Sequence, residues 1–161
     1  MALGKLITAV SFALCAIAPV SAFAQQNVNG CEIRPQTYCG AADLHGANLQ
    51  FAHLYSADLQ KVNLSKANLQ QAQLYSSVFD GADLSNANAS GANFVGADML
   101  NTNLSGANFS RANLKGANLT NADLSGANFR KANLEGAILE GAKLEGANFE
   151  GAKTQGCKGC P

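Results

Sequence analysis

The sequence predicts an all-β solenoid whose chain follows the outline of a square and stacks coil upon coil. Three observations predict this fold. A five-residue phrase, visible in "ANLKGANLTNADLSGANF" at 112–129, repeats along most of the chain. A small residue and a large apolar residue stand two apart in each phrase, and side chains twenty residues apart tend to be of one kind. A period of five fits neither a helix nor an uninterrupted strand, so the chain must turn at regular intervals.

The first element, residues 1–24, has the layout of a secretory signal peptide. Lys5 precedes an apolar run from Leu6 to Val20, and Ala22-Phe23-Ala24 supplies the small residues of a cleavage site. The run is shorter than the roughly 20 residues that a membrane-spanning helix needs. We therefore expect cleavage after Ala24 and a mature protein in the bacterial periplasm or outside the cell, with no membrane attachment. A retained membrane anchor is the alternative.

The charge of the chain is balanced and excludes electrostatic recognition as its main device. The whole sequence has 11 basic and 11 acidic residues, and loss of Lys5 with the signal segment leaves ten against eleven, a net charge of about −1 at neutral pH. Such a chain lacks the cationic field that binds nucleic acid or anionic lipid. It also lacks the strong negative field of a DNA mimic, so we expect no nucleic-acid partner.

The repeats begin at Ala42 and continue to Gly151 as 22 units without a phase slip. The central residue is Leu in fifteen units and Phe in five, with Ala89 and Met99 as the exceptions. The residue two positions earlier is Ala in nineteen units. Residues two apart on an extended segment point to the same side. Both should therefore face the interior, while the Asp or Asn between them faces solvent.

The last position of each unit predicts a corner. It is Gly in eleven units and Asn in three, and these residues tolerate the positive φ that a type II turn requires at its third position. Each unit is then a short extended edge followed by a corner. If a corner turns the chain through about a right angle, four units close a coil of twenty residues, and coils stack at about 4.8 Å. The 22 units make about 5.5 coils, or a length of about 26 Å.

Columns of residues twenty apart support this path. One inward column consists of Leu44, Leu64, Leu84, Leu104, Leu124 and Leu144. One outward column is Asn in all six coils, from Asn48 to Asn148, as in the amide ladders of stacked β structures. The neighbouring outward column, which starts at Asp43, alternates carboxylates with amides before it ends in Lys143. This alternation avoids like charges at strand spacing.

The units "ANLKG", "ADLSG" and "ANFEG" resemble the consensus of the pentapeptide-repeat family over about 110 of the 161 residues. The resemblance implies a right-handed quadrilateral β-helix, in which each coil contacts only its neighbours and the ends need caps. It divides the chain into a signal peptide (1–24), an N-terminal cysteine-containing cap (25–41), the β-helix (42–156) and a C-terminal CxxC tail (157–161). Because each end exposes an unpaired edge, we expect a monomer or an end-to-end homodimer.

Four cysteines follow the signal segment, and all lie outside the repeats. Cys31 and Cys39 precede the repeats, and Cys157 and Cys160 follow them. The predicted length of the rod exceeds the Cα separation of about 4.4 to 6.8 Å that a disulfide tolerates, which excludes pairing across the ends of one chain. In an oxidising compartment we predict Cys31 with Cys39 and Cys157 with Cys160. The latter pair could instead be redox-active or form half of a zinc site, but no second ligand pair lies nearby in the sequence.

The sequence offers little for catalysis. Its two histidines are His45, predicted at a corner, and His53, predicted on an edge. The faces of a solenoid are convex and offer no obvious cleft, so we expect no enzyme activity, no cofactor and no metal. The candidate interaction patch consists of Phe51, His53, Tyr55, Tyr75 and Val95, of which the last three are spaced by twenty. Exposed aromatic side chains in a patch can mark a protein contact. We prefer the interpretation that they stack from coil to coil and stabilise the N-terminal coils.

The regular pattern without a catalytic site predicts a non-enzymatic periplasmic or secreted scaffold or protein-interaction module, with an unknown protein as a possible partner. The alternative comes from the resemblance, because cytoplasmic pentapeptide-repeat proteins that resemble DNA bind a topoisomerase. The signal segment and the near-zero charge argue against that alternative. Binding of ice or glycan by a flat ladder is a third interpretation, and only the Asn column supports it.

Overall fold

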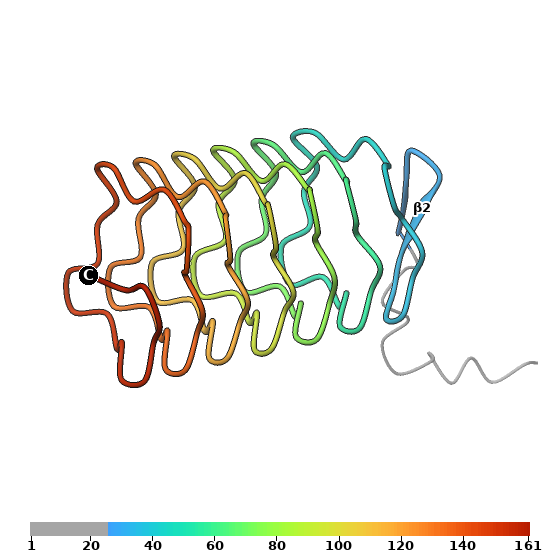
Figure 1. Cartoon of the computed structure of the whole chain (residues 1–161). Coiled ribbons are helices and arrows are strands. Elements are labelled where there is room, and N and C mark those ends of the chain that lie inside the picture. The colour runs from blue at the N-terminus through green and yellow to red at the C-terminus, as the bar shows by residue number, and fades with distance from the viewer. Residues whose placement is uncertain (1–25) are drawn as a thin grey trace, which may run out of the picture.

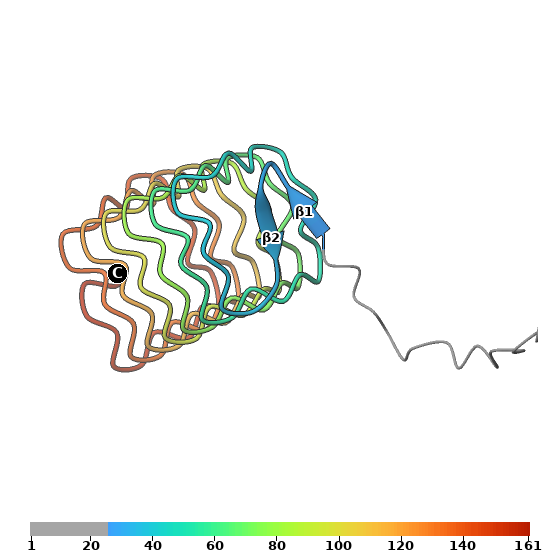
Figure 2. The same cartoon turned by 90° about the vertical axis from the view of Figure 1, so that its right-hand side faces the viewer.

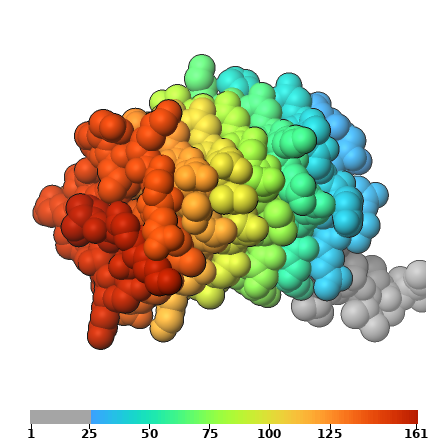
Figure 3. Space-filling view, viewed as in Figure 1, coloured from blue at the N-terminus to red at the C-terminus, as the bar shows by residue number. Residues whose placement is uncertain are grey.

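The computed structural model describes residues 26–161, and the predicted signal peptide, residues 1–24, lies outside them. The described part of the chain begins with an antiparallel hairpin of β1 (Gln26–Val28) and β2 (Cys31–Ile33) and then winds as a four-sided coil to its C-terminus (Figure 1). Successive coils lie in register along one axis, and together they form a continuous rod (Figure 3). Within residues 26–161, no helix has the length and apolar character needed to cross a membrane.

The coil contains twenty residues, as the sequence predicts. Every isolated β-bridge joins two residues twenty apart in parallel orientation, from Tyr38 with Asp58 to Ile138 with Lys158. The bridged residue of each unit is the outward-facing one between the small and the large inward residue. The ladder therefore begins within the segment that the sequence places in the N-terminal cap, and it ends within the C-terminal tail.

In most units all five backbone N–H groups find an acceptor. Three donate to carbonyls of the adjacent coils, one closes the corner turn, and one donates to the side chain of the outward Asp or Asn two residues earlier. In the unit around Leu104 the five bonds are Asn103 N to Ala82 O at 2.9 Å, Leu104 N to Asp123 O at 2.8 Å, Ser105 N to Asn103 Oδ1 at 3.1 Å, Gly106 N to Ser125 O at 2.9 Å and Ala107 N to Leu104 O at 3.0 Å. The intercoil ladder thus supplies the backbone partners that a buried chain requires.

The corners keep one backbone conformation whatever residue occupies them. The third residue of the corner turn has a positive φ at every unit, as the sequence predicts for Gly and Asn. The same conformation is found at bulky residues such as Phe51 (φ 61°), Lys61 (φ 55°) and Arg111 (φ 60°). Their left-handed conformation costs free energy because the Cβ atom approaches the following carbonyl. The intercoil hydrogen bonds of these corners must offset that cost.

The outward Asp and Asn side chains form a second ladder. The side chain of Asn108 accepts from Ser110 N at 3.1 Å and donates from Nδ2 to Asn88 Oδ1 at 3.3 Å, and it accepts from Asn128 Nδ2 at 3.2 Å. An Asp can only accept, so an Asp stacked on an Asp would have no donor. This explains the alternation of carboxylates with amides in the column that starts at Asp43, where Asn63 Nδ2 donates to Asp43 Oδ1 at 2.9 Å.

Replacing Asn108 with Ala is expected to lower the free energy of unfolding by about 1–3 kcal/mol, because three hydrogen bonds are lost and Ser110 N is left without its acceptor. Urea unfolding followed by circular dichroism measures the change. Ser110→Ala is the matched control on the same edge, and we expect it to change stability by less than about 0.5 kcal/mol. Equal effects of the two variants would contradict the role of the amide ladder.

Three surface ion pairs follow the same twenty-residue spacing. Lys115 lies 3.4 Å from Glu135, and Arg130 lies 3.3 Å from Glu150, as the columns predict. Lys143 Nζ contacts Asp123 at 3.3 Å. Hydrogen bonds from the Ser125 hydroxyl and backbone N–H, together with the charge of Lys143, hold the pKa of Asp123 below its ordinary value. All of these pairs are exposed, so each contributes little to stability.

The core is a shaft of inward side chains on the axis of the coil. The central residues from Leu44 to Leu139 are all buried. Where Ser77 and Thr102 replace the inward Ala, their hydroxyls donate to carbonyls of the preceding coil, to Leu54 O at 2.6 Å and to Phe79 O at 3.0 Å. The buried polar groups are therefore satisfied, and the shaft tolerates them.

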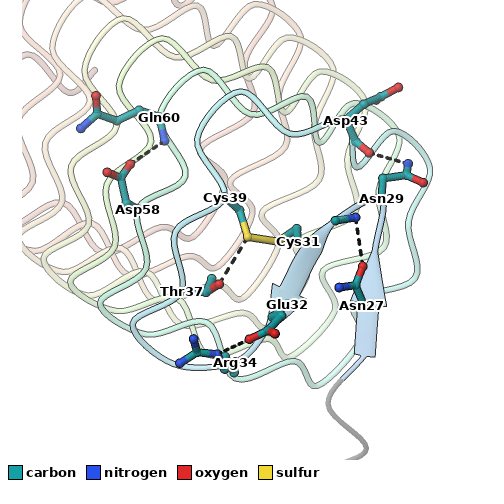
Figure 4. Close-up of a disulfide and its surroundings, with 11 residues drawn as sticks. Asn27, Asn29, Cys31, Glu32, Arg34, Thr37, Cys39, Asp43, Asp58 and Gln60 are labelled. Atoms are coloured by element: carbon teal, nitrogen blue, oxygen red, sulfur yellow. Dashed lines mark hydrogen bonds and ion pairs between the residues drawn. A yellow bond between two sulfur atoms is a disulfide. The ribbon is translucent and has the colours of Figure 1, made fainter.

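The two ends of the shaft differ. At the N-terminal end the hairpin lies across the opening (Figure 2), with Val28 and Ile33 packed against the core. The Cys31–Cys39 disulfide, predicted from the sequence, joins β2 to the first coil (Figure 4), and both cysteines are buried. At the C-terminal end Leu144 and Phe149 are only partly buried. In the described part of the chain, no backbone carbonyl accepts a hydrogen bond from the N–H of either residue, so this end of the ladder is open.

Candidate interaction surface

One side of the rod differs from the others in its outward residues. On each side, three columns run along the axis: two at the flanking corners and one on the edge between them. On this side, each of the three columns starts with two residues that are twenty apart. They are Phe51 and Gln71 at one corner, His53 and Gln73 on the edge, and Tyr55 and Tyr75 at the other corner. The edge column thus has His and Gln where most edges have Asp or Asn.

These residues line an open, shallow hollow of about 600 Å³. The hollow is lined by Phe51, His53, Tyr55, Gln71, Gln73, Tyr75 and Gly91, and we call this set of residues the tyrosine face. Four of the five residues of the predicted patch line it, whereas Val95, one coil beyond Tyr75, does not. The sequence analysis missed Gln71, Gln73 and Gly91. Their signal is the coil period, because Gln71 and Gly91 continue the Phe51 column and Gln73 continues the His53 column.

Tyr55 and Tyr75 form one wall of the hollow. Their ring centroids are 4.9 Å apart and their planes differ by 3°, which is a stacked pair. The two residues are twenty apart, so the coil spacing itself brings the rings together. Each ring covers one face of the other, and both side chains are partly buried.

The edge between the walls is held in place by amides. Gln73 Nε2 donates to Gln71 O at 3.4 Å, and Gln73 Oε1 accepts from Asn93 Nδ2 at 3.3 Å. His53 pairs with Gln73 in the backbone ladder. The edge is therefore part of the rigid coil, and the site is pre-formed rather than assembled from a flexible loop.

Phe51 forms part of the other wall and breaks two local preferences. Its side chain is 52% exposed, and its φ of 61° places a bulky residue in the left-handed region. Such residues are uncommon there. The other non-glycine corners, such as Lys61 and Arg111, share this strain, so it is a property of the coil and not of this face alone. Gly occupies this corner position in eleven units and would adopt the conformation without strain.

Replacing both Tyr55 and Tyr75 with Ser is expected to lower the free energy of unfolding by about 1–3 kcal/mol, because an aromatic pair contributes roughly 0.5–1.5 kcal/mol beyond its burial. Thermal unfolding measures the change, and Val95→Ser in the same column is the control without a ring partner. An unchanged melting temperature in the tyrosine variant would contradict the stacking role and leave only a contact role for the two rings.

The other candidate groups lie apart from this face. His45 Nδ1 lies 2.7 Å from Ser65 Oγ at a different corner of the coil, so the structure does not bring the two histidines into one site. Cys157 and Cys160 are joined in a disulfide, and neither sulfur is then a thiolate, which is the form that binds zinc or attacks a disulfide. Residues 26–161 contain no cluster of three or more His, Cys, Asp or Glu side chains that could hold a metal ion.

Solved structures with similarity to the chain are themselves repeat proteins. A pentapeptide repeat protein from the thylakoid lumen of Arabidopsis thaliana is 33% identical over 60% of this chain and 64% of its own, with a TM-score of 0.44. The protein Rfr23 from the cyanobacterium Cyanothece 51142 is 28% identical over 75% of this chain and 90% of its own, with a TM-score of 0.41. HetL from Nostoc, which is involved in the regulation of heterocyst differentiation, is 30% identical over 76% of this chain and 70% of its own, with a TM-score of 0.33.

No curated protein sequence matches the chain. The chain does match the family described as pentapeptide repeats (8 copies), over residues 42–81, 77–116 and 112–151. These segments overlap and together span the whole stretch that the sequence analysis divides into units. The four-sided coil with its bridges twenty residues apart is the path that this family implies. The chain therefore belongs to the pentapeptide-repeat family.

Proposed function

We propose that the protein is a non-enzymatic scaffold of the periplasm or the extracellular space, with a rod of about 5.5 coils, which binds a protein partner through the tyrosine face. The observation that carries this proposal is Phe51, an exposed aromatic side chain held at a strained corner beside a hollow. The left-handed conformation is common to every corner, but the exposure of a large apolar side chain does not help folding, and such a departure from local preference is expected where a surface serves binding. A rigid, hydrogen-bonded rod supplies the pre-formed support that binding sites need.

The extracytoplasmic location is supported by two features of the chain. Two disulfides close its ends, and disulfides persist in oxidising compartments. The first 24 residues have the charge, apolar run and small residues of a secretory signal.

Cell fractionation combined with site-specific photo-crosslinking tests the proposal in the full-length protein. A photoreactive side chain replaces Gln71, which lines the hollow, or Lys61, the equivalent corner position on the opposite side of the rod. We expect the protein in the extracytoplasmic fraction and a discrete crosslinked protein from position 71 alone. The same product from both positions, or none from position 71, would contradict a partner at the tyrosine face.

A further inference from the structure

The tyrosine face cannot accept a partner as an added β-strand. Strand addition needs a row of free backbone donors and acceptors, whereas the backbone here is occupied by the neighbouring coils. Gln73 N donates to Ala52 O at 2.8 Å, Leu74 N donates to Asn93 O at 2.8 Å, and Ser76 N donates to Val95 O at 2.9 Å. Recognition at this face must therefore use side chains and isolated donors.

The hollow has such donors and is lined by no carboxylate, ammonium or guanidinium group. In most units the side chain of the outward Asp or Asn accepts a hydrogen bond from the backbone N–H of the residue two positions later in the chain. In this unit the outward residue is Gln73, and its side-chain oxygen accepts from Asn93 instead. Among residues 26–161, no acceptor is recorded for the backbone N–H of Tyr75. The hydroxyls of Tyr55 and Tyr75 and the side-chain amide of Gln71 are further donors, and no Asp, Glu, Lys or Arg lines the hollow. A ligand with exposed carbonyl oxygens matches these donors.

The aromatic walls present edges and ridges more than open ring faces. The stack covers one face of each tyrosine ring, which leaves a poor platform for a sugar that must lie flat on an aromatic face. A groove between Phe51 and the tyrosine pair instead suits a ligand with compact apolar rings along its length. Polyproline II segments have this shape, carry solvent-exposed carbonyls and bind aromatic-lined grooves with little loss of entropy.

The geometry points to a proline-rich segment in the polyproline II conformation as the ligand of the tyrosine face. This inference rests on the proposed function and names the chemistry of its partner. It accounts for the exposed Phe51, for a donor-rich hollow without Asp, Glu, Lys or Arg, and for a backbone that cannot pair with a strand.

Residues farther along the same side of the rod also predict which side chains of the ligand should flank its prolines. The Phe51 column continues through Gln71 and Gly91 to Arg111 and Lys131. Neither of these two cations has an ion pair with another described residue. Arg111 lies three coils from Phe51, about 14 Å at strand spacing, which corresponds to about five residues of polyproline II at 3.1 Å each. Acidic residues about five positions from the proline at Phe51 should therefore strengthen binding.

Tyrosine fluorescence of the mature protein tests this inference. The chain has no Trp and three Tyr, and two of the three line the hollow. The probes are octaproline, octaproline extended by two Glu or two Lys at either end, a Gly-Ser peptide of equal length, and cellohexaose as a neutral oligosaccharide. We expect saturable binding of octaproline, tighter binding of one Glu-extended peptide at low salt, and no response to the Gly-Ser peptide.

Matched variants separate binding from folding. Phe51→Gly removes an exposed side chain and its strain, so the melting temperature should stay within a few degrees while octaproline affinity falls at least fivefold. Lys61→Gly is the same change on the opposite side and should leave affinity unchanged. Arg111→Gln combined with Lys131→Gln should abolish the preference for Glu over Lys without weakening octaproline.

The outcomes also distinguish this inference from the proposed function. Binding of cellohexaose in place of octaproline, or equal loss of affinity in Phe51→Gly and Lys61→Gly, would overturn the assignment of a proline-rich ligand. A crosslinked partner at position 71 without octaproline binding would overturn it while leaving the proposed function intact. Absence of both the crosslinked partner and octaproline binding would reject the proposed function and the proline-rich ligand together.

Discussion

Replacing Phe109 with Ala is expected to lower the free energy of unfolding by about 3–5 kcal/mol, the range for removal of a buried Phe side chain. Phe109 is fully buried, and its ring centroid lies 5.3 Å from those of both Phe94 and Phe129. The residue before it in its column is Ala89. The variant would therefore leave two small residues in adjacent coils, and the intercoil ladder prevents the backbone from collapsing into the space.

Urea unfolding with the disulfides intact measures this loss. Phe109→Leu is the control, because it keeps most of the volume and should cost about 1–1.5 kcal/mol. In a solenoid, where each coil contacts only its neighbours, a cavity in the middle should also reduce the coupling between the two halves. A loss below about 1 kcal/mol in the Ala variant would contradict the tight packing of the aromatic column.

Removing the N-terminal disulfide is the second change with a large expected effect. Replacing Cys31 and Cys39 with Ala should cost about 2–4 kcal/mol. The bond closes a loop with a sequence separation of 8, for which the chain-entropy estimate alone is about 2.5 kcal/mol. Both cysteines are buried, and Cys31 belongs to β2 of the hairpin, so loss of the bond would also loosen the cap over the first coil.

The matched control replaces Cys157 and Cys160 with Ala. This bond closes a sequence separation of only 3, and the last coil is already partly exposed, so we expect a smaller loss of about 1–2 kcal/mol. Hydrogen exchange should show faster opening at Leu44 and Leu49 in the first variant only. A larger loss from the C-terminal pair would show that the hairpin does not protect the end of the shaft.

The path of the chain could be predicted because its information is local and repeated. The spacing of inward residues, the corner glycines and the columns of like side chains each predict a coil of twenty residues, and the bridges confirm it. The Cys31–Cys39 bond followed from the same geometry, since a rod keeps its two ends apart. The salt bridges of Lys115 and Arg130 followed in the same way.

What escaped the sequence analysis depends on particular side-chain contacts. The preference for Asp or Asn was interpreted as stacking between coils, but these side chains also accept the N–H two residues on, as Asn103 does for Ser105. The exposed aromatics could be placed on one side, whereas the hollow depends on Gln71 and Gly91, which have no aromatic or charged signal of their own. Likewise, the left-handed corner at Phe51 contradicts its residue type and is imposed by the neighbouring coils.

The coil of twenty residues has a consequence for how the gene can lengthen. A duplication of one five-residue unit keeps every inward side chain in phase, so folding survives, but everything downstream rotates by a quarter turn. Residues such as Arg111, which share a side with the tyrosine face, would then move to an adjacent side. Only duplications of twenty residues preserve the surface, so a single small insertion can reassign binding determinants among the sides of the rod without disturbing its interior.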